Sequence, residues 1–374
     1  MNTTAYKNEL IKRRFFDYLK NSKGFSQKSI ESYEQAIWRW EEYTHKADFA
    51  QFNKTTAELF KDWVKMKKKA NSEERVSISY CYDILRYLKV FFEWLSKQAG
   101  YKSKINQSAI DYLNLTRKEI RIATQPKSVD FPSLEDIKAV IENIKGNSEI
   151  EKRDKALISL AFLTGARIEA IITLSMGCFD KKRMIIDQDP KLGVKTKFSK
   201  RIVSSLIPFS YKEPLKYFCD WFVYLEKEKG FKPDDPIFPA TKIENGKNNL
   251  SYYNTGEVEA IFWKSTSSPR KIFEKRFTQA GVRYYKPHSL RHLLVKQIIK
   301  LPLTEEQKKA ISQSLGHEDV GTTFGSYGYA KIEENKQIEI IREIDFEGKK
   351  ENVKYILSEE DFDYLAERMK KPSA

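Results

Sequence analysis

Hydrophobic residues recur at helical spacing through roughly the first 115 residues of the chain. Ser26 is a candidate N-cap, because a serine side chain can accept a hydrogen bond from the first turn of a helix. Gly24 and Gly100 follow helical patterns, where glycine often ends a helix. The pattern predicts four helices: residues 7–24, 26–46, 56–70 and 72–100. Their tryptophans fall at helical spacing and are predicted core residues: Trp38, Trp40, Trp63 and Trp94.

The polar and basic stretch 116–136 predicts a boundary. Pro126 and Pro132 bracket a segment that we expect to be extended, since proline disfavours helix in the residue before it. Ser133 then opens a new helix, and Asp136 completes a capping box. The predicted organisation has four parts: a helical domain at 1–118, a basic interdomain linker at 119–131, a second domain at 132–345 and a C-terminal tail helix at 346–374.

The second domain mixes helical and strand patterns. Residues 153–174 predict two helices split at Thr164 and Gly165. Two runs rich in β-branched residues predict strands at 183–188 and 200–208, joined by a basic turn. Further helical patterns cover five segments: 214–230, 256–281 (two helices or parts of them), 304–317, 336–344 and 358–371. The predicted fold class is mainly α with a small β-sheet (α+β).

Composition adds a charge argument to this picture. The net charge of +15 indicates a polyanionic partner, mainly nucleic acid, although charge alone does not identify it. No stretch approaches the roughly 18 apolar residues of a membrane span, and the N-terminus lacks an apolar signal core, so we expect a cytoplasmic protein with no membrane partner. The three cysteines lie far apart without zinc-ligand spacing, so no metal site is expected: Cys81, Cys178 and Cys219.

Candidate chemistry lies in the motif "HSLRH" at 288–292. His288 and Arg291 are three residues apart at the start of a predicted helix, where an anion would offset their unfavourable interaction with the helix dipole. The alternative is an exposed helix end with ordinary ion pairs. Arg167 follows the helix break at Gly165 in the same way, and Glu169 close behind it is a candidate partner that orients a basic group.

Two more features lie downstream. Gly316 ends a predicted helix, and His317 follows it directly. Tyr327 comes ten residues later between two glycines, Gly325 and Gly328, which suggests a backbone bent to present the side chain. The alternative is a packing residue, since most of the chain's 20 tyrosines will be in packing roles.

Together these motifs resemble the signature of the tyrosine recombinases of the phage-integrase family over residues 130–345. The N-terminal helices resemble that family's core-binding (SAM-like) domain. The resemblance implies that Arg167 and Arg291 bind the scissile phosphate, that His288 is a general acid/base and that His317 donates a hydrogen bond to the phosphate. It implies Tyr327 as the nucleophile, with no metal and no ATP or other cofactor.

Two assignments keep alternatives open. The family's hairpin lysine, which protonates the leaving 5′-oxygen, is best matched by Lys195; Lys200 fits better if spacing is counted back from Pro208, and Lys191 and Lys197 share the turn. Many members place the tyrosine nine residues after the histidine, which is Ser326 here, and others place it ten after, which is Tyr327. Tyr329 is the competitor, and His292 is interpreted as a structural helix residue.

The resemblance implies a site-specific DNA recombinase or integrase that works through a 3′-phosphotyrosyl intermediate, for integration or excision of a mobile element. The alternatives are a type IB topoisomerase-like or telomere-resolving enzyme, or a DNA-binding regulator that has lost catalysis. The basic side chains predicted to contact DNA are Lys65, Lys67, Lys68, Lys69, Arg117, Lys118, Arg121, Lys127, Lys197 and Lys200, although a charge run at a helix end is often only solvated.

The expected partner is double-stranded DNA in the nucleoid. Recombination needs four active sites on two duplexes, so we expect a monomer or weak dimer that becomes a homotetramer on DNA. An accessory DNA-bending or directionality protein is a further candidate partner. Residues 336–344 or the tail at 346–374 are expected to pack on a neighbouring protomer, with packing in cis as the alternative.

Overall fold

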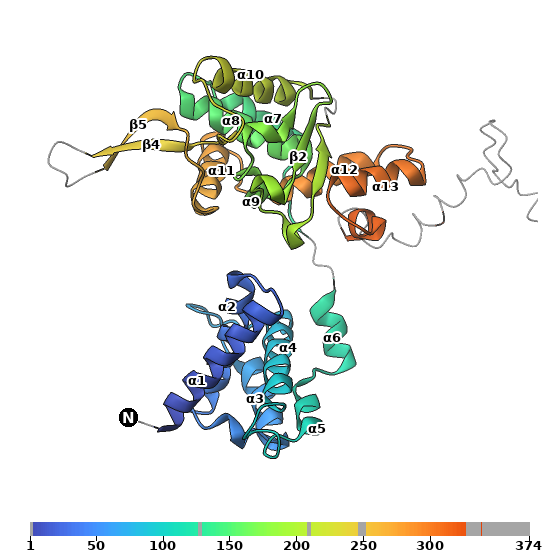
Figure 1. Ribbon diagram of the computed structural model, residues 1–374. Helices are drawn as coiled ribbons and strands as arrows, with labels where there is room; N and C mark the ends of the chain where they lie inside the picture. The colour runs from blue at the N-terminus through green and yellow to red at the C-terminus, as the bar shows by residue number, and fades with distance from the viewer. Residues whose placement is uncertain (1–2, 126–128, 208–210, 246–251, 327–337, 339–374) are drawn as a thin grey trace, which may run out of the picture. The chain divides into compact units, whose positions relative to one another are not determined.

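The computed structural model describes residues 3–125, 129–207, 211–245, 252–326 and 338 of the chain. The chain divides into two compact units, Met1–Lys127 and Ser128–Ala374 (Figure 1). None of the helices described has the length and apolar character needed to cross a membrane.

The first unit is helical. Its α-helices are α1 (Thr3–Asp17), α2 (Gln27–Tyr43), α3 (Lys54–Met66), α4 (Ile78–Leu95), α5 (Gln107–Ile110) and α6 (Arg117–Thr124). A π-helical turn, Tyr18–Ser22, continues α1. Ser26 caps α2 as predicted, because its hydroxyl accepts a hydrogen bond from the Ser29 N–H at 3.3 Å.

Aromatic rings form the centre of the first unit. The ring centroid of Trp40 lies 5.0 Å from those of Phe60 and Phe92, and the Trp40 side chain is buried. Trp38 is 52% exposed, so its predicted place in the core is wrong. The physical reason is helical geometry, since residues two apart point to different sides of a helix. Trp63 and Trp94 are partly buried and pack against the same core.

Two predicted boundaries in the first unit are also wrong. The fourth helix begins at Ile78 rather than near Ser72, because Ser77 caps it and residues 67–76 fold into a tight turn. In that turn the Lys69 N–H donates to the Glu74 carbonyl at 2.8 Å. The linker predicted at 119–131 begins inside α6. This helix starts at a capping box formed by Thr116 and Glu119, and it packs on α4.

The second unit combines helices with two small antiparallel sheets. Its helices are α7 (Leu134–Asn143), α8 (Glu149–Thr164), α9 (Ile168–Ile171), α10 (Glu213–Lys227), α11 (Ser267–Gln279), α12 (Ser289–Ile299) and α13 (Glu305–Ser314). One sheet has the order β1-β2-β3, with β1 (Phe179–Asp180), β2 (Ile185–Gln188) and β3 (Ile202–Ser205). The fold class is confirmed as mainly α with small β-sheets.

The second sheet is a hairpin that the sequence pattern missed. Strands β4 (Ala240–Asn245) and β5 (Tyr252–Glu259) pair antiparallel and project from the second unit (Figure 1). The prediction of two helices within 256–281 is therefore wrong in its first part, and only α11 forms there. The reason is that strand pairing with β4 decides the structure of β5, and that pairing is invisible within 256–281.

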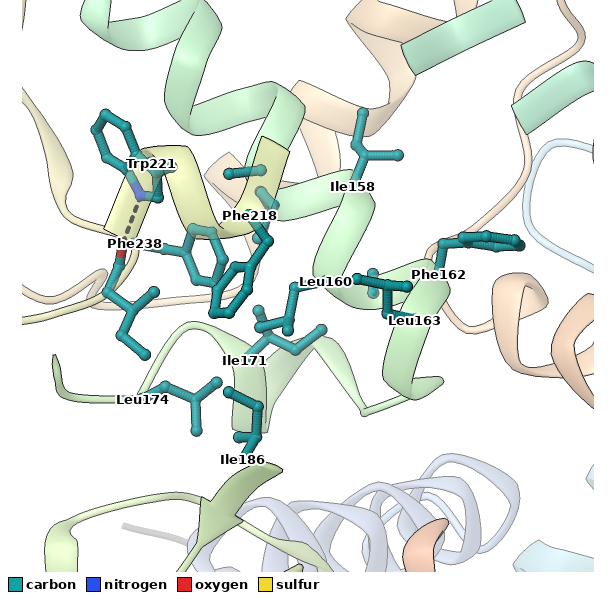
Figure 2. Packing of buried hydrophobic residues seen from close by; sticks show 14 of the residues in the cluster. Ile158, Leu160, Phe162, Leu163, Ile171, Leu174, Ile186, Phe218, Trp221 and Phe238 are labelled. Atoms are coloured by element: carbon teal, nitrogen blue, oxygen red, sulfur yellow. Dashed lines mark hydrogen bonds between the residues drawn. The ribbon is translucent and has the colours of Figure 1, made fainter. Parts of the chain in front are cut away.

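Helix α8 runs through the core of the second unit. Its residues from Ala156 to Thr164 are all buried, and it packs against α10 and α12. Figure 2 shows Leu160 on the side of α8 that faces Phe218 of α10 and Ile171, whereas Ile158 and Phe162 lie on the other side of the helix. The Trp221 indole N–H donates to the Ile237 carbonyl at 2.8 Å, which satisfies the buried donor (Figure 2).

A buried charge network anchors the start of α8. The two carboxylate oxygens of Asp154 accept hydrogen bonds from Arg153 at 2.9 Å and from Arg276 of α11 at 2.8 Å. Arg153 also donates to the Thr241 hydroxyl of β4 at 2.9 Å. The network therefore connects α8, α11 and the hairpin, and each buried charge has a partner, as burial requires.

Candidate active site

The end of α8 begins the site. Gly165 takes a left-handed conformation with φ +57°, which glycine adopts without steric cost. A Cβ at this position would lie 3.1 Å from Leu294 of α12 and 3.2 Å from Leu315, so the three segments are in close approach. This packing brings the residues after α8, the start of α12 and the end of α13 together.

Arg291 lies at the centre of this contact. Its side chain is buried, and its guanidinium donates to the Gly165 carbonyl at 3.1 Å and to the Leu315 carbonyl. It also lies 2.7 Å from Nε2 of His317. The carbonyl contacts fix the plane of the guanidinium. The contact with His317 joins the motif at 288–292 and the Gly316–His317 pair, which were predicted separately, in one site.

His317 is held from both sides of its ring. Nδ1 lies 2.8 Å from the Thr323 hydroxyl, and the backbone N–H donates to the Ser312 carbonyl at 2.8 Å. Because a guanidinium can only donate, Nε2 accepts from Arg291 and the proton is assigned to Nδ1. Gly316, with φ +75°, has no room for a Cβ, which would clash with Ile202 of β3.

Both histidines are driven toward the neutral form. Burial, followed by the positive charges of Arg291 and Arg167, lowers the pKa of His317 to about 3. The exposed His288 also has a lowered pKa, through partial desolvation and then the charges of Arg291, His292 and Arg167. Arg291 thus contacts His317 directly, and the charges of Arg291 and Arg167 act on both imidazoles, so the four residues lie within electrostatic range of one another.

Arg167 is the more available of the two arginines. It is the N-cap residue of α9, it is half-buried, and its guanidinium makes no hydrogen bond or ion pair with the residues that the structure describes. Glu169 is exposed, and its carboxylate contacts no basic group within the same residues, so its orienting role stays a prediction. Two guanidinium groups and two neutral imidazoles can together bind an anion and transfer a proton.

His292 has a packing role beside the site. Its ring stacks on Phe131 with centroids 6.2 Å apart and stands nearly perpendicular to the ring of His288 at 5.8 Å. This agrees with its interpretation as a structural residue of the helix.

The basic turn between β2 and β3 lies beside the site. Its lysines are Lys191, Lys195, Lys197 and Lys200. The Lys195 N–H donates to the Thr173 hydroxyl at 2.9 Å, and Lys200 forms an ion pair with Glu318. The charge of Lys197 contributes to the lowered pKa of His317, so Lys197 is within electrostatic range of the site. The choice of Lys195 as the hairpin acid stays a prediction.

Several predicted residues lie outside the described residues. These are Tyr327, Tyr329, Lys127, the segment 336–344 except Ile338, and the tail at 346–374. The described chain reaches Ser326, which ends a π-helical turn, Thr322–Ser326, that packs on α12.

The DNA-binding candidates of the first unit carry acidic partners. Each of the four lysines of the run forms an ion pair: Lys65 with Glu119, Lys67 with Glu42, Lys68 with Glu73 and Lys69 with Glu74. Arg117, Lys118 and Arg121 are exposed on α6. In the second unit, Lys197 is exposed and Lys200 is half-buried.

Sequence reasoning missed the hydroxyl groups that support the site. Thr323 holds His317, and Thr173 holds the backbone at Lys195. Neither threonine belongs to a periodic pattern or a motif in the sequence. Thr173 contacts a residue far along the chain, and Thr323 lies in an irregular segment, so neither contact can be predicted from local spacing. The pair of threonines in "GTTF" so soon after His317 was the one local hint.

Comparison with known proteins gives two family matches. The model described as "Phage integrase family" matches residues 131–334, and the model "Phage integrase, N-terminal SAM-like domain" matches residues 13–99. The chain is 23% identical over 316 residues to the tyrosine recombinase XerD of Rickettsia conorii, which covers 83% of this chain and 91% of that protein. It is 25% identical over 174 residues to XerD of Neisseria meningitidis serogroup B, covering 46% of this chain and about half, 48%, of that protein.

Solved structures show the same fold. A lambda integrase tetramer bound to a Holliday junction has a TM-score of 0.57 at 13% identity, and the match covers 86% of this chain and 79% of that one. The Tn1549 transposon integrase in complex with transposon right end DNA has a TM-score of 0.56 at 13% identity, covering 88% of this chain and 98% of that one.

Proposed function

Because the chain belongs to the phage integrase family, whose model matches residues 131–334, we propose that it is a site-specific DNA recombinase that works through a 3′-phosphotyrosyl intermediate. The observation that carries this proposal is the convergence of Arg167, His288, Arg291 and His317 at the end of α8. The Tn1549 relative, a transposon integrase bound to transposon DNA, supports integration or excision of a mobile element as the role.

The arginines would bind the non-bridging oxygens of the scissile phosphate. Arg291 is fixed by the Gly165 and Leu315 carbonyls, so it presents a pre-oriented positive charge. Arg167 has donors that no described protein group occupies, and it would supply the second contact. Fixed donors cost no reorganisation as charge develops on the phosphate, which makes them effective in the transition state.

His288 and the hairpin lysine would transfer the protons. The lowered pKa of His288 keeps it neutral near pH 7, so it can accept the proton of the Tyr327 hydroxyl. The Tyr327 oxygen would attack phosphorus and form a new P–O bond while the bond to the 5′-oxygen breaks. Lys195 would donate the proton to that 5′-oxygen. The linkage to tyrosine conserves the phosphodiester, so the reverse reaction rejoins DNA without an energy source.

The partner would be duplex DNA, bound by a homotetramer. The lambda integrase relative is a tetramer on a Holliday junction, which supports four protomers acting on two duplexes. Monomers or weak dimers would assemble on the DNA. An accessory directionality protein would then decide between integration and excision.

A covalent-capture experiment tests the proposal. The full chain is incubated with a library of duplexes that carry a random segment interrupted by a nick, so that cleavage near the nick releases a short fragment and traps the enzyme. Wild-type protein should yield adducts that survive denaturation and carry DNA through its 3′ end. Tyr327→Phe should yield none, and the matched control Tyr329→Phe should keep the wild-type yield.

The outcomes separate the alternatives. If Tyr329→Phe rather than Tyr327→Phe abolishes the adduct, the nucleophile assignment is wrong. If the wild type selects sequences but never forms an adduct, the chain is a DNA-binding regulator and not a recombinase. If adducts form and supercoiled DNA is only relaxed, without strand exchange between two duplexes, the topoisomerase alternative gains.

The hairpin lysine can be assigned with a modified substrate. Replacing the 5′-bridging oxygen by sulfur gives a leaving group that needs no proton, so loss of the general acid is rescued on this DNA. Lys195→Ala should be slow on ordinary DNA and near wild type on the sulfur substrate. Lys197→Ala and Lys200→Ala are the matched comparisons, and rescue of either one in place of Lys195→Ala would move the role to that residue.

A further inference from the structure

Phe198 lies in the basic turn between β2 and β3, and its side chain faces solvent. It is 81% exposed, the highest value among the large hydrophobic side chains that the structure describes as exposed. Exposing an aromatic ring of this size forfeits the stabilisation that its burial would give. Single exposed hydrophobic side chains are common on protein surfaces, so the significance of this ring depends on the backbone and the charges around it.

The backbone holds the ring in this position. Phe198 has φ 61° and ψ 22°, and Ser199 has φ 50°, so two successive residues with side chains take the left-handed conformation. This conformation is unfavourable for residues other than glycine and persists where the surroundings impose it. Here the Thr196 hydroxyl donates to the Lys200 carbonyl at 2.6 Å and closes the loop.

The ring lies in a basic turn. The turn between β2 and β3 carries five basic residues, Lys191, Lys195, Lys197, Lys200 and Arg201, and one acidic residue, Asp189, which forms an ion pair with Arg201. The Lys197 ammonium lies 4.9 Å from the centroid of the Phe198 ring. Within the described residues, Lys195 and Lys197 form no ion pair, so their charges are not neutralised by carboxylates. This combination of apolar ring and cations fits nucleic acid better than a protein surface.

The turn lies next to the candidate phosphate site. Lys200 forms an ion pair with Glu318, the residue that follows His317, and Ile202 at the end of the turn packs against Gly316. Lys197 is within electrostatic range of His317. A duplex whose scissile phosphate lies between Arg167 and Arg291 would therefore meet the turn within the same stretch of DNA.

On the basis of the proposed function, we propose that Phe198 is an apolar wedge that inserts against a base step of duplex DNA beside the scissile phosphate. The flanking lysines would hold the adjacent backbone phosphates. Apolar side chains flanked by Lys or Arg unstack base steps in this way, and aromatic rings stack on exposed bases. Local unstacking beside the cleaved bond would help the released strand to leave its duplex for exchange.

The wedge also predicts where the enzyme cuts. Pyrimidine–purine steps unstack more easily than other steps. Among the sequences recovered by covalent capture, such steps should be enriched next to the cleaved phosphate. In sequences captured by a variant without the ring, this enrichment should be lost.

The test uses a captured duplex with 2-aminopurine at the steps on either side of the cleaved phosphate, because this base fluoresces more strongly when unstacked. Phe198→Asn removes the ring, and asparagine tolerates the left-handed conformation, so the turn is preserved. Phe198→Trp keeps an aromatic wedge. Val223→Ala on α10 is the matched control, since Val223 is also an exposed hydrophobic residue, at 40%.

Wild type, Phe198→Trp and Val223→Ala should raise the fluorescence at one step several-fold. Phe198→Asn should lose most of this rise and form the covalent adduct at least tenfold more slowly. Its affinity should keep the wild-type dependence on salt, since the phosphate contacts remain.

The other outcomes overturn the inference or separate it from the proposed function. If Phe198→Asn matches the wild type in fluorescence and adduct rate, the wedge is wrong while the recombinase proposal stands. If the wild type forms no adduct, the proposed function fails, and the same measurement on the non-covalently selected duplexes decides the wedge. If Phe198→Asn changes only the self-association of the protein in light scattering, the ring contacts a second copy of the chain and not DNA.

Discussion

At the scale of single residues, Arg167 and Arg291 differ in what holds them. The Arg291 guanidinium is bonded to two backbone carbonyls, whereas the Arg167 guanidinium has no hydrogen-bond partner among the described residues. Lysine cannot replace the planar fork of a guanidinium in either place. Arg291→Lys should therefore lower both the free energy of unfolding, by about 2 kcal/mol, and the rate of adduct formation, by on the order of 100-fold.

Arg167→Lys provides the contrast. It should slow adduct formation by a similar factor while changing the free energy of unfolding by less than about 0.5 kcal/mol. Urea unfolding and single-turnover capture measure the two effects. Equal losses of stability in both variants would show that Arg167 has a structural partner after all.

His317 makes stability depend on pH in a defined direction. Its folded pKa of about 3 lies below the ordinary value of 6.5, so the unfolded chain binds the proton more tightly. The stabilisation is complete above the ordinary value and is lost as pH falls toward 3. The free energy of unfolding of the second unit should decrease between pH 7.5 and pH 5, and this decrease should be smaller in His317→Gln, measured by urea unfolding.

At the scale of elements, close packing between α13 and β3 sets the position of His317. Gly316→Ala combines a left-handed alanine with contact against Ile202, where a Cβ would lie 2.9 Å from Cγ1. Gly230→Ala measures the cost of the left-handed backbone alone, because Gly230 has φ +68° and a Cβ added there would meet nothing within 4 Å. Gly230→Ala should cost about 1–2 kcal/mol of stability, and Gly316→Ala about 2–5 kcal/mol.

The difference between these two glycine variants measures the contact with β3. Ile202→Val in the Gly316→Ala background should recover part of the loss. Equal losses of stability in Gly230→Ala and Gly316→Ala would show that β3 moves to accommodate the added methyl group without a measurable cost in free energy.

The elements also show what the sequence could predict. The starts of α2 and α7 follow from Ser26 and Ser133, because a cap is a hydrogen bond within one turn. The hairpin β4–β5 was missed, because strands form through pairing with a segment elsewhere in the chain. The site residues Arg167, Arg291 and His317 could be predicted from their motifs, but not the carbonyls and threonine that hold them, since those contacts depend on how the segments pack.

At the scale of the whole molecule, the surplus of positive charge predicts how DNA binding responds to salt. The net charge is +15, yet Lys67, Lys68 and Lys69 are paired with glutamates in the free protein. If these lysines contact phosphates, each must break its ion pair with glutamate when DNA binds. Replacing all three by Gln should weaken binding for every sequence alike and reduce the slope of log K against log salt by about 2–3.

Lys181→Gln, which removes the ion pair with Glu226 in the second unit, is the control. Fluorescence anisotropy over a range of salt concentrations gives the slopes. An unchanged slope in the triple variant would assign these lysines to solvation and ion pairing alone.

The burial of α8 has a consequence for the order in which the second unit opens. A helix enclosed from Ala156 to Thr164 can exchange its amide hydrogens only when the surrounding core separates, so its amides should be among the last to exchange with deuterium. Arg167 follows this helix after only two residues. The arginine that we propose to bind the phosphate is thus attached to the part of the unit that opens last, and local fraying of the projecting hairpin would leave its position unchanged.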